Sequence, residues 1–242
     1  MLDTAVVNDE SKSKIAPRPE KEADGERILS RPFDDGSETE LVKRAKKQIR
    51  QRMKALRGAH SPKTLEAHSA QLTQTLLGLG QLQAATGVAL YWPMVERGEV
   101  DTRGVDAELR RQRKRLYYPF MRPSPSGTLT TGFALTHSSD ELKERGRGFM
   151  EPEPHTIARR GDVDFVVVPA LAADLSGQRI GYGAGYYDAT LSDICPPAAS
   201  CIVLYNFQLL AELPQQAHDV PCDFVVTERA VHATRGPVGQ LR

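Results

Sequence analysis

Phe165-Val-Val-Val-Pro169 is followed by Ala-Leu-Ala-Ala-Asp174 and then by Ser176-Gly-Gln-Arg-Ile-Gly-Tyr-Gly-Ala-Gly-Tyr-Tyr-Asp188. The opening run, in which valines follow Phe165, predicts a short strand that ends at Pro169. No polar residue alternates through this run, so both faces of the strand are expected to be buried, as they are in a parallel sheet. The chain must then leave the sheet through the glycine-rich loop.

The loop places Gly181, Gly183 and Gly185 at every second position. Without Cβ atoms on one side, consecutive backbone N–H groups can approach an anion closely, and Arg179 adds a fixed positive charge beside them. Residues 187–191 predict the start of a helix, whose N-terminus also favours phosphate. The loop lacks the ending of a Walker A motif and the spacing of a dinucleotide fold, so the glycines alone are weak evidence, and a tight turn with aromatic packing is the alternative.

Length and charge restrict the class of protein. A chain of 242 residues suffices for one substantial α/β core, and its formal net charge of +1 gives no global field that would favour nucleic acid or membrane. The longest apolar run is far too short for a transmembrane helix, and the N-terminus shows no secretory signal. We therefore expect a soluble protein with no membrane partner.

The cysteine pattern indicates a reducing compartment. Cys195, Cys201 and Cys222 form no Cys-x-x-Cys pair, which argues for free thiols in the cytoplasm and against a zinc site. We expect a cytoplasmic protein.

The N-terminal part of the chain divides into a polar segment and a basic helix. Residues 1–38 are rich in charged residues and proline and are expected to be disordered. A helix is predicted over residues 40–57, with an apolar stripe formed by Leu41, Ala45, Ile49, Met53 and Leu56. The many Lys and Arg residues of this helix allow three interpretations, namely a solvated face, a surface for a polyanion, or a few side chains that reach a phosphate site.

Strands and helices then alternate. Helices are predicted after the Ser61-Pro62 cap, over residues 103–114 and, briefly, over residues 207–213. Strands are predicted over residues 86–93, 116–121, 127–135, 165–169 and 200–205 and before Glu228. This alternation predicts a layered α/β domain with a largely parallel sheet, whose ligand loops follow the carboxyl ends of the strands.

The signature Gly177-x-Arg179-x-Gly-Tyr-Gly-x-Gly-Tyr-Tyr-Asp188 resembles that of the 5-formyltetrahydrofolate cyclo-ligase family, also called methenyltetrahydrofolate synthetases. The segment over residues 214–228, with its His-Asp219 pair and its Thr-Glu ending, is similar to the end of the family pattern. The resemblance covers roughly residues 40–230. It departs from the family at Ala173, where phenylalanine is common, and at Ala184, where a third glycine is usual. Ala184 fits if its φ angle stays negative.

The resemblance implies a three-layer α/β/α architecture similar to that of sugar-phosphate isomerases and CoA transferases. It places a single domain at residues 39–230, with a loose tail over residues 231–242. It also implies two small-molecule ligands, ATP and a folate, together with Mg²⁺. We expect a monomer or a weak dimer.

Several site residues are carried over from the family. The implied ATP site comprises Lys46, Lys47, Gln48, Ile49, Arg50, Arg179, Ile180, Gly181, Tyr182, Gly183, Ala184, Gly185, Tyr186 and Tyr187. The implied folate site comprises Met94, Glu99, Phe149 and Tyr187. Asp188 and Asp219 match the metal-binding aspartates, and Lys46, Arg50 and Arg179 would stabilise charge. Lys46 and Arg50 are four positions apart and so share one helix face, with Lys47 as the alternative if the register slips by one.

The implied reaction is the ATP-dependent cyclisation of 5-formyltetrahydrofolate to 5,10-methenyltetrahydrofolate, with no covalent protein nucleophile. Two alternatives stay open. A paralogue could bind nucleotide or folate without turnover, because a fold does not guarantee a reaction. A basic adaptor could bind RNA through the first helix, although its affinity would then depend strongly on salt. Asp188 and Asp219 also have a structural alternative, since each could cap a helix or a turn.

Overall fold

The computed structural model describes residues 35–123, 129–145 and 148–234. The N-terminal extension, which was expected to be disordered, lies outside the described residues up to position 34. Residues 235–242 of the tail, which was expected to be loose, lie outside them as well. None of the described helices is long and apolar enough to cross a membrane.

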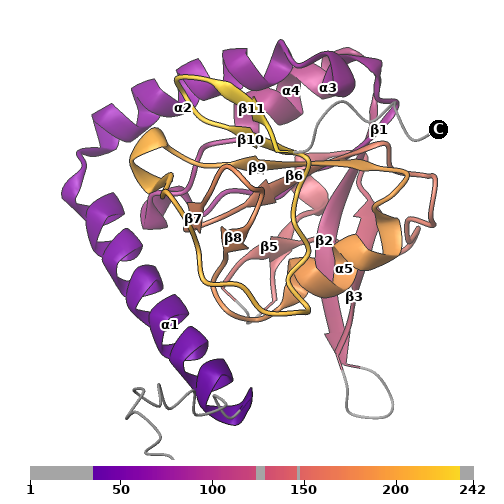
Figure 1. Cartoon of the computed structure of the whole chain (residues 1–242). Coiled ribbons are helices and arrows are strands. Elements are labelled where there is room, and N and C mark those ends of the chain that lie inside the picture. Colours follow the sequence, from indigo (N-terminus) through magenta and orange to yellow (C-terminus); the bar gives the residue numbers. More distant parts are fainter. Residues whose placement is uncertain (1–34, 124–128, 146–147, 235–242) are drawn as a thin grey trace, which may run out of the picture. The chain divides into compact units, whose positions relative to one another are not determined.

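The α-helices surround one large sheet (Figure 1). They are α1 (Asp35–Ala59), α2 (Pro62–Leu77), α3 (Gly80–Ala84), α4 (Arg103–Arg111) and α5 (Tyr186–Ile194). Short 3₁₀ turns are η1 (Val95–Arg97), η2 (Ser139–Glu141) and η3 (Asn206–Gln208). Helix α2 begins as predicted, because Ser61 caps it by accepting a hydrogen bond from the Thr64 backbone N–H at 3.1 Å.

The large sheet has seven strands in the order β11-β10-β9-β6-β1-β2-β3. These strands are β1 (Gly87–Ala89), β2 (Arg115–Pro123), β3 (Leu129–Leu135), β6 (Phe165–Pro169), β9 (Ala199–Val203), β10 (Phe224–Val226) and β11 (Val231–Ala233). The inner strands pair in parallel, and only the edge strands β3 and β11 pair antiparallel to their neighbours. The predicted, largely parallel sheet is therefore confirmed.

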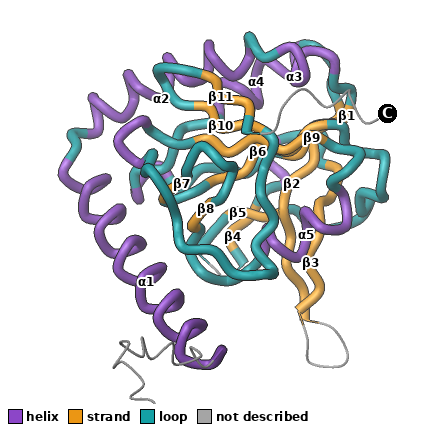
Figure 2. Tube along the Cα trace, viewed as in Figure 1, coloured by secondary structure: helices purple, strands orange, loops and turns teal. Residues whose placement is uncertain are grey.

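Two small antiparallel pairs accompany the large sheet. They are β4 (Lys143–Glu144) with β5 (Met150–Glu151), and β7 (Ala172–Ala173) with β8 (Arg179–Ile180). Figure 2 shows that loops predominate around β7 and β8. The glycine-rich loop directly follows β8.

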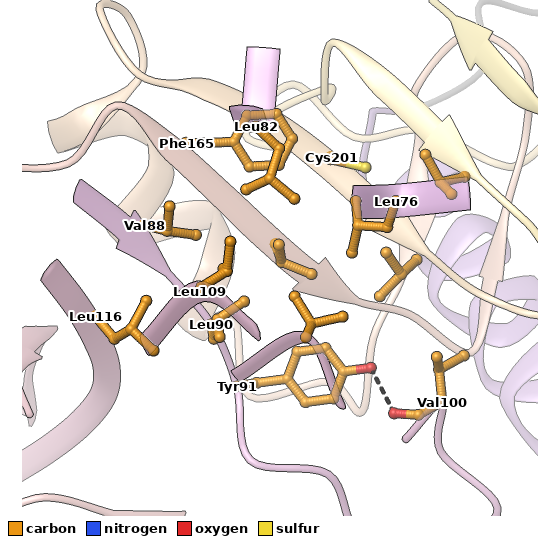
Figure 3. Packing of buried hydrophobic residues seen from close by; sticks show 14 of the residues in the cluster. Leu76, Leu82, Val88, Leu90, Tyr91, Val100, Leu109, Leu116, Phe165 and Cys201 are labelled. Atoms are coloured by element: carbon orange, nitrogen blue, oxygen red, sulfur yellow. Dashed lines mark hydrogen bonds between the residues drawn. The ribbon is translucent and has the colours of Figure 1, made fainter. Parts of the chain in front are cut away.

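Helices cover both faces of the large sheet. On strand β6, Phe165 and Val167 belong to the apolar cluster that contains Leu76 of α2 and Leu109 of α4 (Figure 3). The alternating residues of β6 belong to a second cluster with Leu191 of α5. Burial on both faces is what the unbroken apolar run predicted, and it gives a three-layer α/β/α arrangement.

Helix α1 packs through the second half of its predicted stripe. Met53 is buried against Leu171 and Ile180, with Ile49 and Leu56 packed beside it. Leu41 is 56% exposed, so the first turns of the helix contribute little to the core.

Three predicted boundaries were wrong. Helix α1 begins at Asp35, four residues before the predicted domain start. The helix predicted over residues 207–213 is only the turn η3, because the Leu210 N–H donates to Ala173 O at 2.9 Å instead of continuing a helix. Residues 231–233 of the predicted tail form β11, whose backbone groups pair with those of β10.

Candidate active site

A cavity of about 570 Å³ opens where the glycine-rich loop faces α1 and the carboxyl end of β1. This volume is typical of a small-molecule site. The lining contains Lys43, Lys46, Arg50, Tyr91, Trp92, Met94, Arg97, Glu99, Pro119, Met121, Gly148, Phe149, Met150, Pro169, Arg179, Ile180, Gly181, Tyr182, Gly183, Ala184, Gly185, Tyr186, Tyr187, Asp188, Gln216, His218 and Asp219. Residues from distant parts of the sequence thus meet in one place.

Lys46 is a buried cation in the wall of this cavity. Its side chain is 7% exposed, and Nζ donates to the two carboxylate oxygens of Asp219 at 2.6 and 2.8 Å. Nζ also lies 3.3 Å from Gln216 Oε1. Asp219 in turn accepts from the Gln216 backbone N–H at 2.7 Å, so this carboxylate both closes a local turn and holds the lysine. The ammonium group is fixed at the cavity before any ligand arrives.

Arg50 holds the glycine-rich loop against α1. Its Nε donates to Gly181 O at 2.9 Å, and its guanidinium packs beside Gly183. Gly183 has φ +105°, a conformation that is costly for any residue with a Cβ atom. The neighbouring Ala184 is not among the described residues with positive φ, which confirms the condition under which alanine was expected to fit.

If the loop binds ATP, as the family resemblance implies, Gly183→Ala should raise the KM for ATP about tenfold, because strain of about 1–2 kcal/mol would displace the loop from Arg50. Steady-state kinetics at varied ATP measure this effect. Gly161→Ala is the matched control, since Gly161 also has positive φ (+94°) but no neighbour within 4 Å. It should lower stability similarly while leaving the KM for ATP unchanged. Equal KM values for ATP in the two variants would contradict the assignment of the glycine-rich loop to ATP binding.

Arg179 and Asp188 form the second charge pair of the cavity. Arg179 Nη2 lies 2.6 Å from Asp188 Oδ1, and the arginine side chain is only 5% exposed. Arg179 also donates to the backbone oxygen of Val220. The first glycine of the signature supports this region, because a Cβ on Gly177 would lie 2.2 Å from Cys222 O. Gly177 therefore permits a close backbone approach.

Asp188 does not cap the helix in which it lies. Gly185 is the N-cap of α5, and the Asp188 carboxylate faces Arg179 and the Val220 N–H instead. In the part of the chain that the structure describes, no group of three or more His, Cys, Asp or Glu residues is arranged to hold a metal ion. The two predicted metal ligands each contact a cation.

Aromatic and apolar side chains also line the cavity, among them Trp92, Met94, Phe149 and Met150. Glu99 is a carboxylate of the same lining, and it is only 3% exposed. It accepts from the Met94 backbone N–H at 2.9 Å. Burial raises the pKa of Glu99, an effect that the Met94 hydrogen bond and the charge of Arg57 offset only in part.

Tyr187 follows the glycine-rich loop and packs against the second apolar cluster, which contains Leu191. Its ring packs near Phe133 and Tyr186, at centroid distances of 6.4 and 5.0 Å. Its hydroxyl is buried with no hydrogen-bond partner among the described residues, although the residue lines the cavity. A buried hydroxyl without a partner costs free energy, so a ligand that supplies one would bind here favourably.

Three of the predicted ATP residues lie away from the cavity. Lys47 and Gln48 are exposed, and Ile49 packs into the α1 cluster. The register of Lys46 and Arg50 is thus the one that faces the site, and the alternative at Lys47 does not. The helix period puts positions 47–49 on other faces of α1.

Sequence reasoning missed several lining residues. Tyr91, Trp92, Arg97, Gln216 and His218 lie in the wall. Tyr91 and Trp92 lie at the end of the stretch predicted as a strand over residues 86–93, and Gln216 and His218 shortly precede Asp219, so proximity in sequence to a predicted element was the available signal. Lys43 was not distinguished from the other basic residues of the first helix.

The family model described as 5-formyltetrahydrofolate cyclo-ligase matches residues 42–228. The chain belongs to this family. A cyclo-ligase of Escherichia coli is 31% identical over 166 residues, covering 63% of this chain and 90% of that protein. A cyclo-ligase of Mycolicibacterium smegmatis is 41% identical over 91 residues, and this match spans 36% of the chain and less than half, 47%, of that relative.

A solved structure agrees with the cyclo-ligase assignment. The NMR structure of Aquifex aeolicus 5,10-methenyltetrahydrofolate synthetase is 31% identical, with a TM-score of 0.68, and the match covers 81% of this chain and 96% of that one. The family resemblance inferred from the glycine-rich signature is confirmed.

Proposed function

We infer that the protein catalyses the ATP-dependent cyclisation of 5-formyltetrahydrofolate to 5,10-methenyltetrahydrofolate. Family membership supports this reaction, as do the names of the relatives. The observation that carries it is the composition of the cavity beside the glycine-rich loop. Fixed cations, a glycine-rich loop, aromatic side chains and a buried carboxylate all line this cavity. One cavity can therefore hold a phosphate donor beside a pterin.

The chemistry requires activation of the formyl oxygen. An amide oxygen is a poor leaving group, so it first attacks the terminal phosphorus of ATP and ADP departs. N10 of the folate then attacks the formyl carbon and loses its proton, and the C–O bond breaks to release phosphate. In phosphoryl transfer a protein mainly positions groups and neutralises charge, so no protein nucleophile is needed.

Three cations support a role in charge stabilisation. Lys46 and Arg179 are buried and held by carboxylates, while Arg50 contacts the loop that would surround the phosphates. Because their positions are fixed in advance, these groups do not need to reorganise as charge develops on the transferred phosphoryl group. Tyr187 and the apolar wall would exclude water from the reacting oxygen.

In the same cavity, Glu99 would accept hydrogen bonds from the N–H groups of the pterin. Its Met94 hydrogen bond occupies one acceptor position and fixes the carboxylate. Met94 and Phe149 would pack against the ring, as their place in the wall permits. Orientation of the pterin in this way determines where the formyl oxygen lies.

Mg²⁺ fits the two aspartates of the site. The ion commonly takes one or two carboxylates together with substrate phosphate oxygens, and Asp188 and Asp219 present such carboxylates in the cavity. They would hold the ion once phosphate oxygens complete its ligand set, and the ion would supply charge neutralisation for phosphoryl transfer. Their present partners, Arg179 and Lys46, would then be available to the phosphates.

Asp188→Asn should lower kcat about a hundredfold, because asparagine keeps the shape of the side chain and loses the negative charge. Partial recovery at raised Mg²⁺ should accompany this loss, and titration of turnover against Mg²⁺ measures both. Asp193→Asn, an exposed aspartate of the same helix, is the matched control and should behave as wild type. A normal dependence of turnover on Mg²⁺ in Asp188→Asn would show that Asp188 does not bind the metal ion.

The direct test of the proposed function is incubation with 5-formyltetrahydrofolate, ATP and Mg²⁺, followed by the ultraviolet absorbance of the methenyl product. Formation of that product with one ADP per turnover is the expected result. Binding of both ligands without product would favour the inactive paralogue instead.

Further properties remain proposals. The three-layer arrangement supports a relation to the fold of sugar-phosphate isomerases and CoA transferases, and the free thiols of Cys195, Cys201 and Cys222 support a cytoplasmic location. For the assembly state we propose a monomer or a weak dimer, which the sedimentation coefficient would test.

A further inference from the structure

Arg97 and Glu99 line the cavity from one short segment, residues 94–99 around η1. The Arg97 backbone N–H donates to Met94 O at 2.9 Å. In the other direction, the Met94 backbone N–H donates to Glu99 Oε2, also at 2.9 Å. These hydrogen bonds fix the backbone of Arg97 relative to the Glu99 carboxylate. Glu99 is buried and Arg97 is exposed, so the segment runs from the buried wall of the cavity to its solvent side.

The guanidinium of Arg97 lies against Gly148, which also lines the cavity. A Cβ atom added at Gly148 would lie 3.0 Å from Arg97 Nη2 and 3.7 Å from Nη1. Gly148 also has φ +74°, a conformation that is strained for any residue with a side chain. The next two residues, Phe149 and Met150, belong to the apolar lining. Glycine at this position therefore lets the guanidinium lie close to the segment that supplies those side chains.

Arg97 differs from the other arginines of the lining in the partners that the protein supplies. Arg50 donates to Gly181 O. Arg179 contacts the Asp188 carboxylate. Within the residues that the structure describes, the Arg97 side chain forms neither a hydrogen bond nor an ion pair. Its N–H donors are therefore available to an anion that enters the cavity, and a guanidinium can bind a carboxylate through paired hydrogen bonds.

We propose that Arg97 binds a carboxylate of the glutamate tail of 5-formyltetrahydrofolate and so makes the enzyme prefer folates with a charged tail. This inference rests on the proposed function, in which Glu99 holds the pterin at the buried wall. The tail carboxylates are ionised at neutral pH, and charges without a partner are costly to bury. The tail must therefore extend to the solvent side of the cavity. Arg97, at the exposed end of the segment that carries Glu99, meets it there.

Lys43 is the other exposed Lys or Arg side chain of the described lining, and its position favours the nucleotide. It precedes Lys46 by three positions and Arg50 by seven, so it shares their face of α1. Arg97 shares its segment with Glu99 instead. Phosphates and tail carboxylates are both anions, so the two cations differ in the ligand whose affinity each should change.

The test compares two folates that differ only in the charge of the tail. One is 5-formyltetrahydrofolate, and the other is its diamide, in which uncharged primary amides replace both glutamate carboxylates. Isothermal titration calorimetry gives the Kd of each for the wild type and for Arg97→Met. The wild type should bind the charged form about fivefold more tightly, the upper end for a solvent-exposed ion pair. In Arg97→Met the two Kd values should become nearly equal, while the Kd of a non-hydrolysable ATP analogue should not change.

Lys43→Met is the matched control, because it removes an exposed positive charge from the same lining. It should keep the preference for the charged folate. An unchanged preference in Arg97→Met, equal Kd values in the wild type, or an equal loss of preference in Lys43→Met would each overturn the proposal. Weaker binding of the ATP analogue to Arg97→Met would assign Arg97 to the nucleotide and overturn it as well. Failure of the wild type to bind either folate would instead refute the proposed function, so the two failures are distinguishable.

Discussion

Replacing Lys46 by methionine is expected to lower kcat/KM for ATP by about a hundredfold or more, the loss typical of one preorganised electrostatic group. Methionine approximates the length of the lysine stem but carries no charge. Steady-state kinetics at varied ATP measure the loss. Lys47→Met is the matched control, because Lys47 is exposed and does not line the cavity. It should remain within about twofold of wild type.

The same substitution should also lower stability. Lys46 and Asp219 form a buried pair, with side chains 7% and 11% exposed, so removal of the lysine leaves a carboxylate without its partner. Breaking such a pair typically costs about 3–5 kcal/mol, whereas replacing both members costs much less. The double variant Lys46→Met/Asp219→Asn should therefore unfold at a higher denaturant concentration than Lys46→Met alone.

The double variant separates the two roles of Lys46. Because Asp219 is itself a proposed metal ligand, Asp219→Asn alone is the reference for turnover. If the lysine acts on ATP, the double variant should regain stability and still turn over more slowly than Asp219→Asn. Equal turnover in Asp219→Asn and in the double variant would show that Lys46 is only a structural residue, and would remove it from the phosphate site.

Glu99→Gln is expected to lower kcat/KM for 5-formyltetrahydrofolate by about a hundredfold without lowering stability. Glutamine can still accept from the Met94 N–H, but it provides one acceptor oxygen and no charge for the pterin. Hydrogen bonds to charged groups contribute about 1.5–3 kcal/mol, which accounts for most of the expected loss. Glu96→Gln changes an exposed residue of the turn η1, just before Glu99, and should leave both kcat/KM and stability unchanged.

The raised pKa of Glu99 fixes the sign of the stability effect. Burial makes ionisation less favourable in the folded state than in the unfolded state, so the charge costs stability once the pH exceeds the unfolded pKa. The cost is complete above the raised folded pKa and absent below the unfolded one. Denaturant unfolding should therefore show that Glu99→Gln gains stability relative to wild type as the pH rises from acid to neutral. A neutral-pH loss would contradict the burial effect.

The elements predicted correctly from the sequence were those that residues close by in the chain determine. The unbroken run at Phe165 indicated a strand buried on both faces, and the four-residue spacing of Lys46 and Arg50 placed both on the cavity side of α1. The Ser61 cap was also correct. In each case the period or the cap chemistry is local, so long-range packing did not need to be known.

The partners of those residues could not be predicted in the same way. Asp219 is 173 positions from Lys46, and no spacing rule connects them. Arg57 resembles a solvated cation at a helix end, yet the turn at Gly98 and the end of β6 bury it. The edge strand β11 is too short to be recognised by its composition. It is a strand because its backbone groups form hydrogen bonds with those of β10.

The paired charges of the cavity also determine which anions the site rejects. The described lining has five cationic side chains (Lys43, Lys46, Arg50, Arg97 and Arg179) and three carboxylates (Glu99, Asp188 and Asp219). Because Lys46 and Arg179 are already neutralised by Asp219 and Asp188, a small anion must displace a carboxylate from a short contact to bind either of them. A single phosphate or sulfate ion offers too few contacts to offset that loss. In the proposed function, a triphosphate that arrives with its own divalent cation would give each displaced aspartate a new positive partner, so the resting pairs would favour the complete nucleotide–metal complex over the abundant simple anions of a cell.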